Sequence, residues 1–160
     1  MTWRGSPTVK DRIFACLPYL LPLIEGLLRF GELLIQFPAL QLVFLPLAPI
    51  IAIYTKLGSW GGLILFFVLF LAVVRNERIA HFIRFNTMQA LLLDILLVLI
   101  GLVLGILQPV LGSASLVANT LINIVFLGVV IACGYSIVQS LTGRYAEIPS
   151  LSEAAYAQVR

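Results

Sequence analysis

Polar and charged side chains are concentrated in one stretch of this very apolar chain, RNERIAHFIRFNTMQALLLD, from Arg75 to Asp94. The stretch contains three arginines, a glutamate and the single histidine of the chain. Polar groups enter lipid only at a cost, so their presence on a membrane helix predicts a role in function or packing. The predicted polar face or partner contact comprises Asn86, Thr87, Gln89, Asp94, Gly101, Gly105, Gln108, Asn119 and Asn123, and the predicted juxtamembrane anchor comprises Arg75, Arg78, His81 and Arg84.

A stripe of polar and small residues runs along the apolar helix that follows. Steps of 3.6 residues place Thr87, Asp94, Gly101, Gly105 and Gln108 on one side of it. The stripe can line a polar path or grip a partner. It can equally be a packing face, because the two glycines four residues apart allow two helix backbones to approach closely.

Asp94 lies two turns inside this helix, where an isolated carboxylate costs about 2–3 kcal/mol. It therefore needs a cationic or hydrogen-bonding partner, and Arg84, Asn119 and Asn123 are the candidates. The two asparagines are four residues apart, hence on one face of the last apolar helix, where Ser140 also follows. These groups either form interhelical hydrogen bonds or line an aqueous route.

Two further patterns occur in the first apolar run. Glu25 and Arg29 have the spacing and order of a favourable i, i+4 ion pair of modest value. Pro18 and Pro22, one turn apart, predict a kinked helix that exposes carbonyl groups to a partner or a cavity.

Composition places the chain in a membrane. Hydrophobic residues make up 61% and charged residues 11% of its 160 residues, and the mean hydropathy is +1.10. Soluble domains are about 45–50% apolar and about 25% charged. The net charge of +3 comes from residues at the ends of apolar runs, which excludes a nucleic-acid surface and indicates membrane topology and lipid headgroups. Cys16 and Cys133 lie inside apolar runs and are expected to be packing residues without a disulfide.

Catalytic and cofactor motifs are absent from the sequence. His81 has no second histidine or cysteine at ligand spacing, so no metal site is expected. Nucleophile, zinc-protease, phosphate-loop and CxxC motifs are also missing. The sequence therefore predicts a non-enzymatic protein without a cofactor.

The expected fold is all-α and polytopic, with four transmembrane helices of about 20 residues each. The four runs are Ile13–Leu28, Leu57–Val74, Met88–Gln108 and Leu116–Leu141. A fifth run, Phe37–Tyr54, contains three prolines, so a bent, interfacial or re-entrant segment is favoured over a full span. We expect an N-terminal tail over residues 1–12, a membrane domain over 13–141, and a C-terminal tail over 142–160. That tail forms either a short surface helix or a frayed end.

The distribution of positive charge orients these helices. With four spans, the side that holds both termini carries eight basic residues and the other side carries two, Arg29 and Lys56. The positive-inside rule then places both termini in the cytoplasm or stroma. No cleavable signal is expected, because the first apolar run contains Pro18, Pro22 and Glu25 and no small-residue cleavage site follows it.

Three segments carry a family resemblance: CLPYLLPLIEGL (Cys16–Leu27), VVRN (Val73–Asn76) and HFIRFNTMQALLLDI (His81–Ile95). They resemble the 20-kDa subunit family of the chloroplast inner-envelope protein translocon, of the cyanobacterial or plastid-encoded type. The resemblance covers about Arg12 to Leu141. It implies four helices, termini that face the stroma, a part in a protein-conducting path with larger subunits, and no catalytic residues. It also implies a cyanobacterial membrane or the chloroplast inner envelope as the location.

Three functions follow from these observations. The leading one is a membrane subunit of a protein-translocation assembly, contributing to a protein-conducting path or its scaffold. The second is a structural or assembly subunit docked on a larger membrane complex. The third is a small ion or solute transporter, for which Asp94 and Glu25 are the available ionisable groups. The expected partners are membrane lipids, other membrane subunits or further copies of the chain, and a translocating polypeptide.

Overall fold

Helices make up nearly all of the structure, a computed structural model that describes residues 6–112 and 116–159. The α-helices are α1 (Val9–Cys16), α2 (Leu20–Phe30), α3 (Glu32–Gln36), α4 (Gln41–Phe44), α5 (Ala48–Lys56), α6 (Gly61–Leu69), α7 (His81–Leu111), α8 (Leu116–Leu141) and α9 (Leu151–Gln158). Short 3₁₀ turns join several of them, and a π-helical turn, Phe70–Val74, extends α6. The expected all-α class is confirmed.

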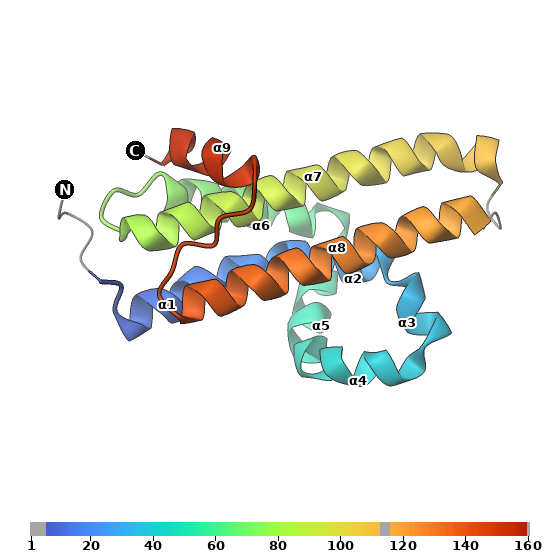
Figure 1. Cartoon of the computed structure of the whole chain (residues 1–160), viewed down its shortest axis with the longest axis horizontal. Coiled ribbons are helices and arrows are strands. Elements are labelled where there is room, and N and C mark those ends of the chain that lie inside the picture. Colours follow the sequence, from blue (N-terminus) through green and yellow to red (C-terminus); the bar gives the residue numbers. More distant parts are fainter. Residues whose placement is uncertain (1–5, 113–115, 160) are drawn as a thin grey trace.

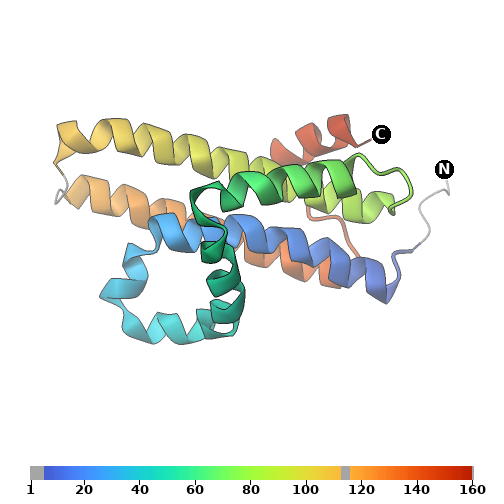
Figure 2. The ribbon, with the colours of Figure 1, turned by 180° about the vertical axis from the view of Figure 1, so that it is seen from behind.

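The long helices lie side by side along one axis. Helices α1 and α2 follow each other and run alongside α6, α7 and α8, while α3, α4 and α5 bow out to one side (Figure 1, Figure 2). The two ends of the chain lie at the same end of the bundle as the connection between α6 and α7. The last turn of α7 and the first turn of α8 lie at the opposite end. The α1–α2 pair and α7 therefore run in one direction along the bundle, and α6 and α8 run in the other.

The sequence explains where the first and last long helices bend and stop. Thr8 caps α1, since its side chain accepts from the Asp11 amide and the Asp11 side chain accepts from the Thr8 amide. Pro18 lies in the 3₁₀ turn between α1 and α2, as expected for a proline-broken helix. Helix α8 ends at Leu141, and the positive φ of 77° at Gly143 allows the two reversed hydrogen bonds of a Schellman motif just after it.

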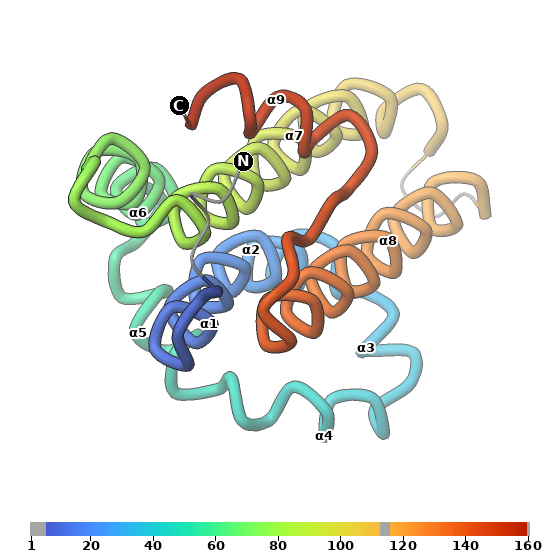
Figure 3. Tube along the Cα trace, turned by 60° about the vertical axis from the view of Figure 1, so that its left-hand side comes forward, coloured from blue at the N-terminus to red at the C-terminus, as the bar shows by residue number. Residues whose placement is uncertain are grey.

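Among the described residues, four stretches are long and apolar enough to cross a membrane: Val9–Phe30, Pro38–Lys56, His81–Leu111 and Leu116–Leu141. The number matches the expectation, but one member differs. The apolar helix Gly58–Val74 is shorter than the about 20 residues that a span needs. Pro38–Lys56 has the length, yet its prolines divide it into short helical pieces that turn away from the bundle (Figure 3). The predicted bent segment is therefore confirmed.

The C-terminal residues pack against the bundle. The sequence left open whether they fray, and the structure has helix α9 lying on the first turns of α7 (Figure 3). Ala146 and Ala155 are fully buried, and Val159 is nearly so. Tyr145 and Tyr156 pack their rings against Phe85. The tail thus contributes to the core at the end of the bundle where both termini lie.

The two cysteines are free, as expected. Cys133 is fully buried among apolar side chains of α8 and its neighbours. The Cys16 thiol lies 3.6 Å from the carbonyl oxygen of Ile137, so it joins α1 to α8 through a weak hydrogen bond.

Candidate functional site: a polar network and a charged crevice along α7

The first turns of α7 carry a buried hydrogen-bond network. Asn86 Oδ1 accepts from the hydroxyls of Tyr19 and Ser140, each at 3.0 Å. Gln89 Nε2 donates to Tyr19 Oη at 2.9 Å and to the carbonyl of Ala146. All five of these residues are fully buried. The network therefore ties the α1–α2 junction, α7, the end of α8 and the C-terminal tail together.

This network packs helices together, and some buried polar atoms in and beside it have no hydrogen-bond partner among the described residues. Gln89 Oε1 and Ser136 Oγ are buried without a hydrogen-bond partner among the described residues. The neighbouring Thr87 hydroxyl donates only within its own helix, to the carbonyl of Ile83 at 2.8 Å. The expectation that Ser140 forms an interhelical hydrogen bond is confirmed. Buried polar groups that connect four segments fix their mutual register.

The predicted juxtamembrane anchor divides into buried and exposed members. Arg84 is 9% exposed, and its Nε donates to the carbonyl of Val74 at 2.9 Å, which holds the end of α6 against α7. Arg75 and Arg78 are exposed on the connection between these helices. Only the exposed pair is therefore free to meet headgroups or a partner.

His81 joins α7 to the tail. Its Nδ1 lies 3.1 Å from Tyr145 Oη and its Nε2 lies 3.1 Å from the carbonyl oxygen of Val159. The ring also stacks on Tyr156. Within the described part of the chain, no cluster of histidine, cysteine or carboxylate side chains is suited to hold a metal ion.

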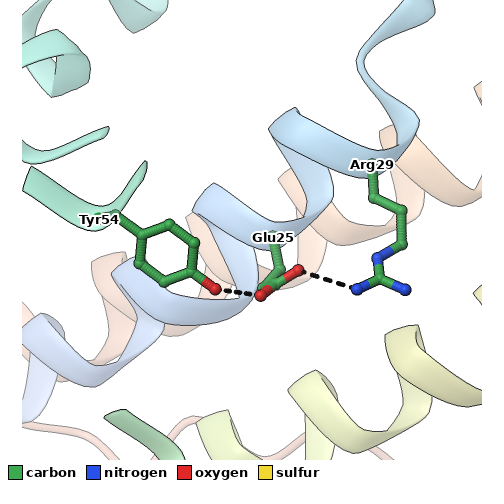
Figure 4. Close-up of polar contacts among 3 residues, drawn as sticks. All are labelled: Glu25, Arg29 and Tyr54. Carbon is green, nitrogen blue, oxygen red and sulfur yellow. Dashed lines mark hydrogen bonds and ion pairs between the residues drawn. The ribbon is translucent and has the colours of Figure 1, made fainter. Parts of the chain in front are cut away.

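A second polar centre lies further along the bundle, where α2, α5 and α7 meet. Glu25 forms a 3.4 Å ion pair with Arg29 and accepts a hydrogen bond from the Tyr54 hydroxyl (Figure 4). Asp94 is 5% exposed and lies within electrostatic reach of Glu25 and Arg29. Its Oδ1 has no hydrogen-bond partner in the described structure. The charged side chains near Asp94 are therefore Glu25 and Arg29 of α2. They were not among the partners that the sequence suggested for Asp94.

The stripe on α7 has a covered half and an open half. A Cβ atom at Gly101 would lie 3.1 Å from Arg29 Cδ, so this glycine allows the arginine to cross the helix. At Gly105 the corresponding space is empty. Beyond the end of α2, Gly101, Gly105 and Gln108 line a crevice of about 220 Å³ together with Arg29 and Glu32. Ala118 and Ile122 of α8 form its opposite wall.

The two asparagines of α8 do not line this crevice. Asn119 and Asn123 are half-buried, and Asn123 Oδ1 has no partner among the described residues. Sequence reasoning also missed Tyr19 and Tyr54, which complete the two polar centres. Both tyrosines lie in apolar runs that prolines interrupt, and that is the only sequence signal that marks them.

The fold and these centres define an all-helical integral membrane protein with a polar face on one long helix. Sequence comparison then gives its family. The family model described as "Chloroplast import apparatus Tic20-like" matches residues 4–155. The chain belongs to the Tic20 family.

Relatives occur in cyanobacteria, algae and plants. A Tic20 family protein of Synechocystis sp. is 53% identical over 153 residues, which cover 94% of each chain. The Tic20 family protein Ycf60 of Gracilaria tenuistipitata var. liui is 35% identical over 95% of this chain and 76% of its own. Protein TIC 20-v, chloroplastic, of Arabidopsis thaliana is 33% identical over 96% of this chain and 73% of its own.

Proposed function

We propose that the chain is a non-enzymatic membrane subunit of a protein-translocation assembly. Its open crevice on α7 and α8 contacts either a passing polypeptide or a neighbouring subunit. The name of the matching family, a chloroplast import apparatus, supports the first part of the proposal. The observation that carries the second part is the open half of the polar stripe.

Arg29 explains why this crevice needs an occupant other than lipid tails. Its side chain pairs with Glu25 at 3.4 Å, yet it is 45% exposed beside Gly101 of α7. The exposed part of a charged group is costly in lipid unless water or a polar partner meets it. Glu32 and Gln108 line the same crevice, so a polar or hydrated segment fits there better than an acyl chain.

The bundle is also too small to enclose a polypeptide by itself. Past the end of α2 the chain turns aside into α3, and the far ends of α7 and α8 extend beyond it as a pair (Figure 1). Two helices leave both sides of the crevice uncovered, so further subunits or further copies of this chain complete the wall. We also propose that both termini face the cytoplasm or stroma, because Arg75, Arg78 and Arg144 lie at that end of the bundle.

Site-specific photocrosslinking tests the proposal. A photoreactive residue replaces Gln108 in the crevice, and the matched control replaces Ile106, which is 74% exposed and does not line the crevice. In membranes engaged in translocation, we expect position 108 to capture a protein and position 106 to capture lipid. Equal protein capture at both positions, or none at Gln108, would refute a crevice-specific contact.

The same experiment separates translocation from assembly. An adduct that appears only while a substrate polypeptide is in transit supports the conducting path. An adduct of constant mass with and without substrate supports a structural subunit docked on a larger complex. One observation supports the alternative of an ion transporter, because the carboxylates of Asp94 and Glu25 lie within electrostatic reach of each other. Flux through reconstituted protein that is unchanged by Asp94→Asn would exclude it.

A further inference from the structure

A second, larger groove lies on another side of the molecule. It has a volume of about 700 Å³ and runs between the α1–α2 pair and α6, with the first turns of α7 as its floor. Leu17 and Leu21 line one wall and Leu65 and Val68 the other. Ligand sites in proteins are typically about 300–1,000 Å³, so the groove has room for a molecule of substantial size.

The groove offers no free polar group to an occupant among its described lining residues. Two hydroxyls reach it, from Thr87 and Tyr54, and both are engaged. Thr87 donates to the carbonyl of Ile83, and Tyr54 donates to Glu25. An occupant that fits such walls is apolar along its whole buried length, as an acyl chain is.

The shape of the groove distinguishes an acyl chain from a partner helix. A transmembrane helix continues straight for about 20 residues and needs a groove that is open at both ends. Here Ile53, Tyr54 and Leu57 line one end, where α5 crosses beside the α1–α2 pair (Figure 2). A straight chain that enters from the other end therefore meets α5 here.

The other end of the groove lies at the basic end of the bundle. Val73 and Ile79 both line it there, and the connection between them carries Arg75 and Arg78. Both arginines are exposed, and neither has an ion-pair partner within the described residues. Basic residues beside an apolar slot between membrane helices complement an anionic headgroup.

We propose that this groove binds one acyl chain of an anionic membrane lipid, with the headgroup held by Arg75 and Arg78. The site lies apart from the α7–α8 crevice and does not depend on the role in translocation. Its lipid seals the gap between α6 and the α1–α2 pair, where the protein itself makes few contacts. We expect the site to bind lipids with anionic headgroups in preference to lipids with neutral ones.

Native mass spectrometry of the purified full chain tests the site, with equal amounts of phosphatidylglycerol and phosphatidylcholine supplied in mixed micelles. The unmodified protein should retain the anionic lipid over the neutral one. Val68→Trp fills the groove and should lower retention of both lipids. Leu63→Trp is the matched control, because Leu63 lies on α6 with similar exposure but outside the groove lining, and it should leave retention unchanged.

The headgroup contact has its own test, which does not disturb packing. Arg78→Gln should lower the preference for phosphatidylglycerol about fivefold, whereas Arg144→Gln removes the same charge at the same end and should preserve it. Three results would each overturn the proposal: no preference in the unmodified protein, equal retention by the two tryptophan variants, or equal preference in the two glutamine variants. Circular dichroism of each variant shows that a loss of lipid does not reflect a loss of helix.

Discussion

Replacement of Asn86 by leucine tests whether the buried network holds the bundle together. The change keeps the number and branching of the side-chain heavy atoms and removes the oxygen that accepts from the Tyr19 and Ser140 hydroxyls, each at 3.0 Å. Both hydroxyl groups are fully buried, so neither recovers water as a partner. A stranded buried donor costs about 1–3 kcal/mol in a protein core, although interhelical bonds in membrane proteins average only about 0.6 kcal/mol.

A total loss of about 2 kcal/mol follows for the two bonds, or about thirtyfold in the ratio of folded to unfolded protein. Unfolding of the purified protein by dodecyl sulfate in mixed micelles, followed by circular dichroism, measures it. Thr87→Val is the matched control: it is equally buried on the same helix but bonds only to its own helix through Ile83. If the Asn86→Leu variant unfolds at the same fraction of dodecyl sulfate as the Thr87→Val variant, the network adds nothing to stability.

Two further substitutions test the contacts of α2. Gly26→Ala should destabilise the bundle by about 1–3 kcal/mol, because its new Cβ would lie 2.9 Å from a methyl group of Val129 on α8, whose side chain is stiff. Gly128 has open space around it, so Gly128→Ala should be neutral or slightly stabilising in the same unfolding assay. Tyr54→Phe removes the hydrogen bond to Glu25 and should accelerate hydrogen exchange across α5, whereas the exposed control Tyr135→Phe should leave it unchanged; equal exchange in both would refute the contact as a tether.

The sequence predicts the class of fold and the bent segment because both depend on local properties. Apolar runs of sufficient length predict membrane helices. The prolines interrupt the helix over Pro38–Lys56 through local backbone chemistry, whatever this segment packs against. The same reasoning chose Leu57–Val74 as the second span. In the structure this stretch is the shorter apolar helix Gly58–Val74, which begins in a 3₁₀ turn, and its crossing of the membrane stays a prediction.

The polar centres were only partly predictable, because they depend on contacts between distant parts of the chain. Helical periodicity correctly placed Gly101, Gly105 and Gln108 along one side. It has no means of showing that Tyr19 approaches Asn86 across 67 positions of the sequence. The mildly polar composition of the tail likewise hides that Ala146 closes the network, because a backbone carbonyl has no sequence signature.

The two halves of the polar stripe on α7 have different surroundings. Towards the termini, Asn86 and Gln89 form hydrogen bonds to three other segments, so packing accounts for most of their polar atoms. Past Gly101, α2 has ended and no described segment covers Gly105 or Gln108. An unpaired polar surface in lipid is unfavourable, whereas one that meets water, a subunit or a polypeptide is not. Function in this chain is therefore expected in the half of α7 that its own fold leaves bare.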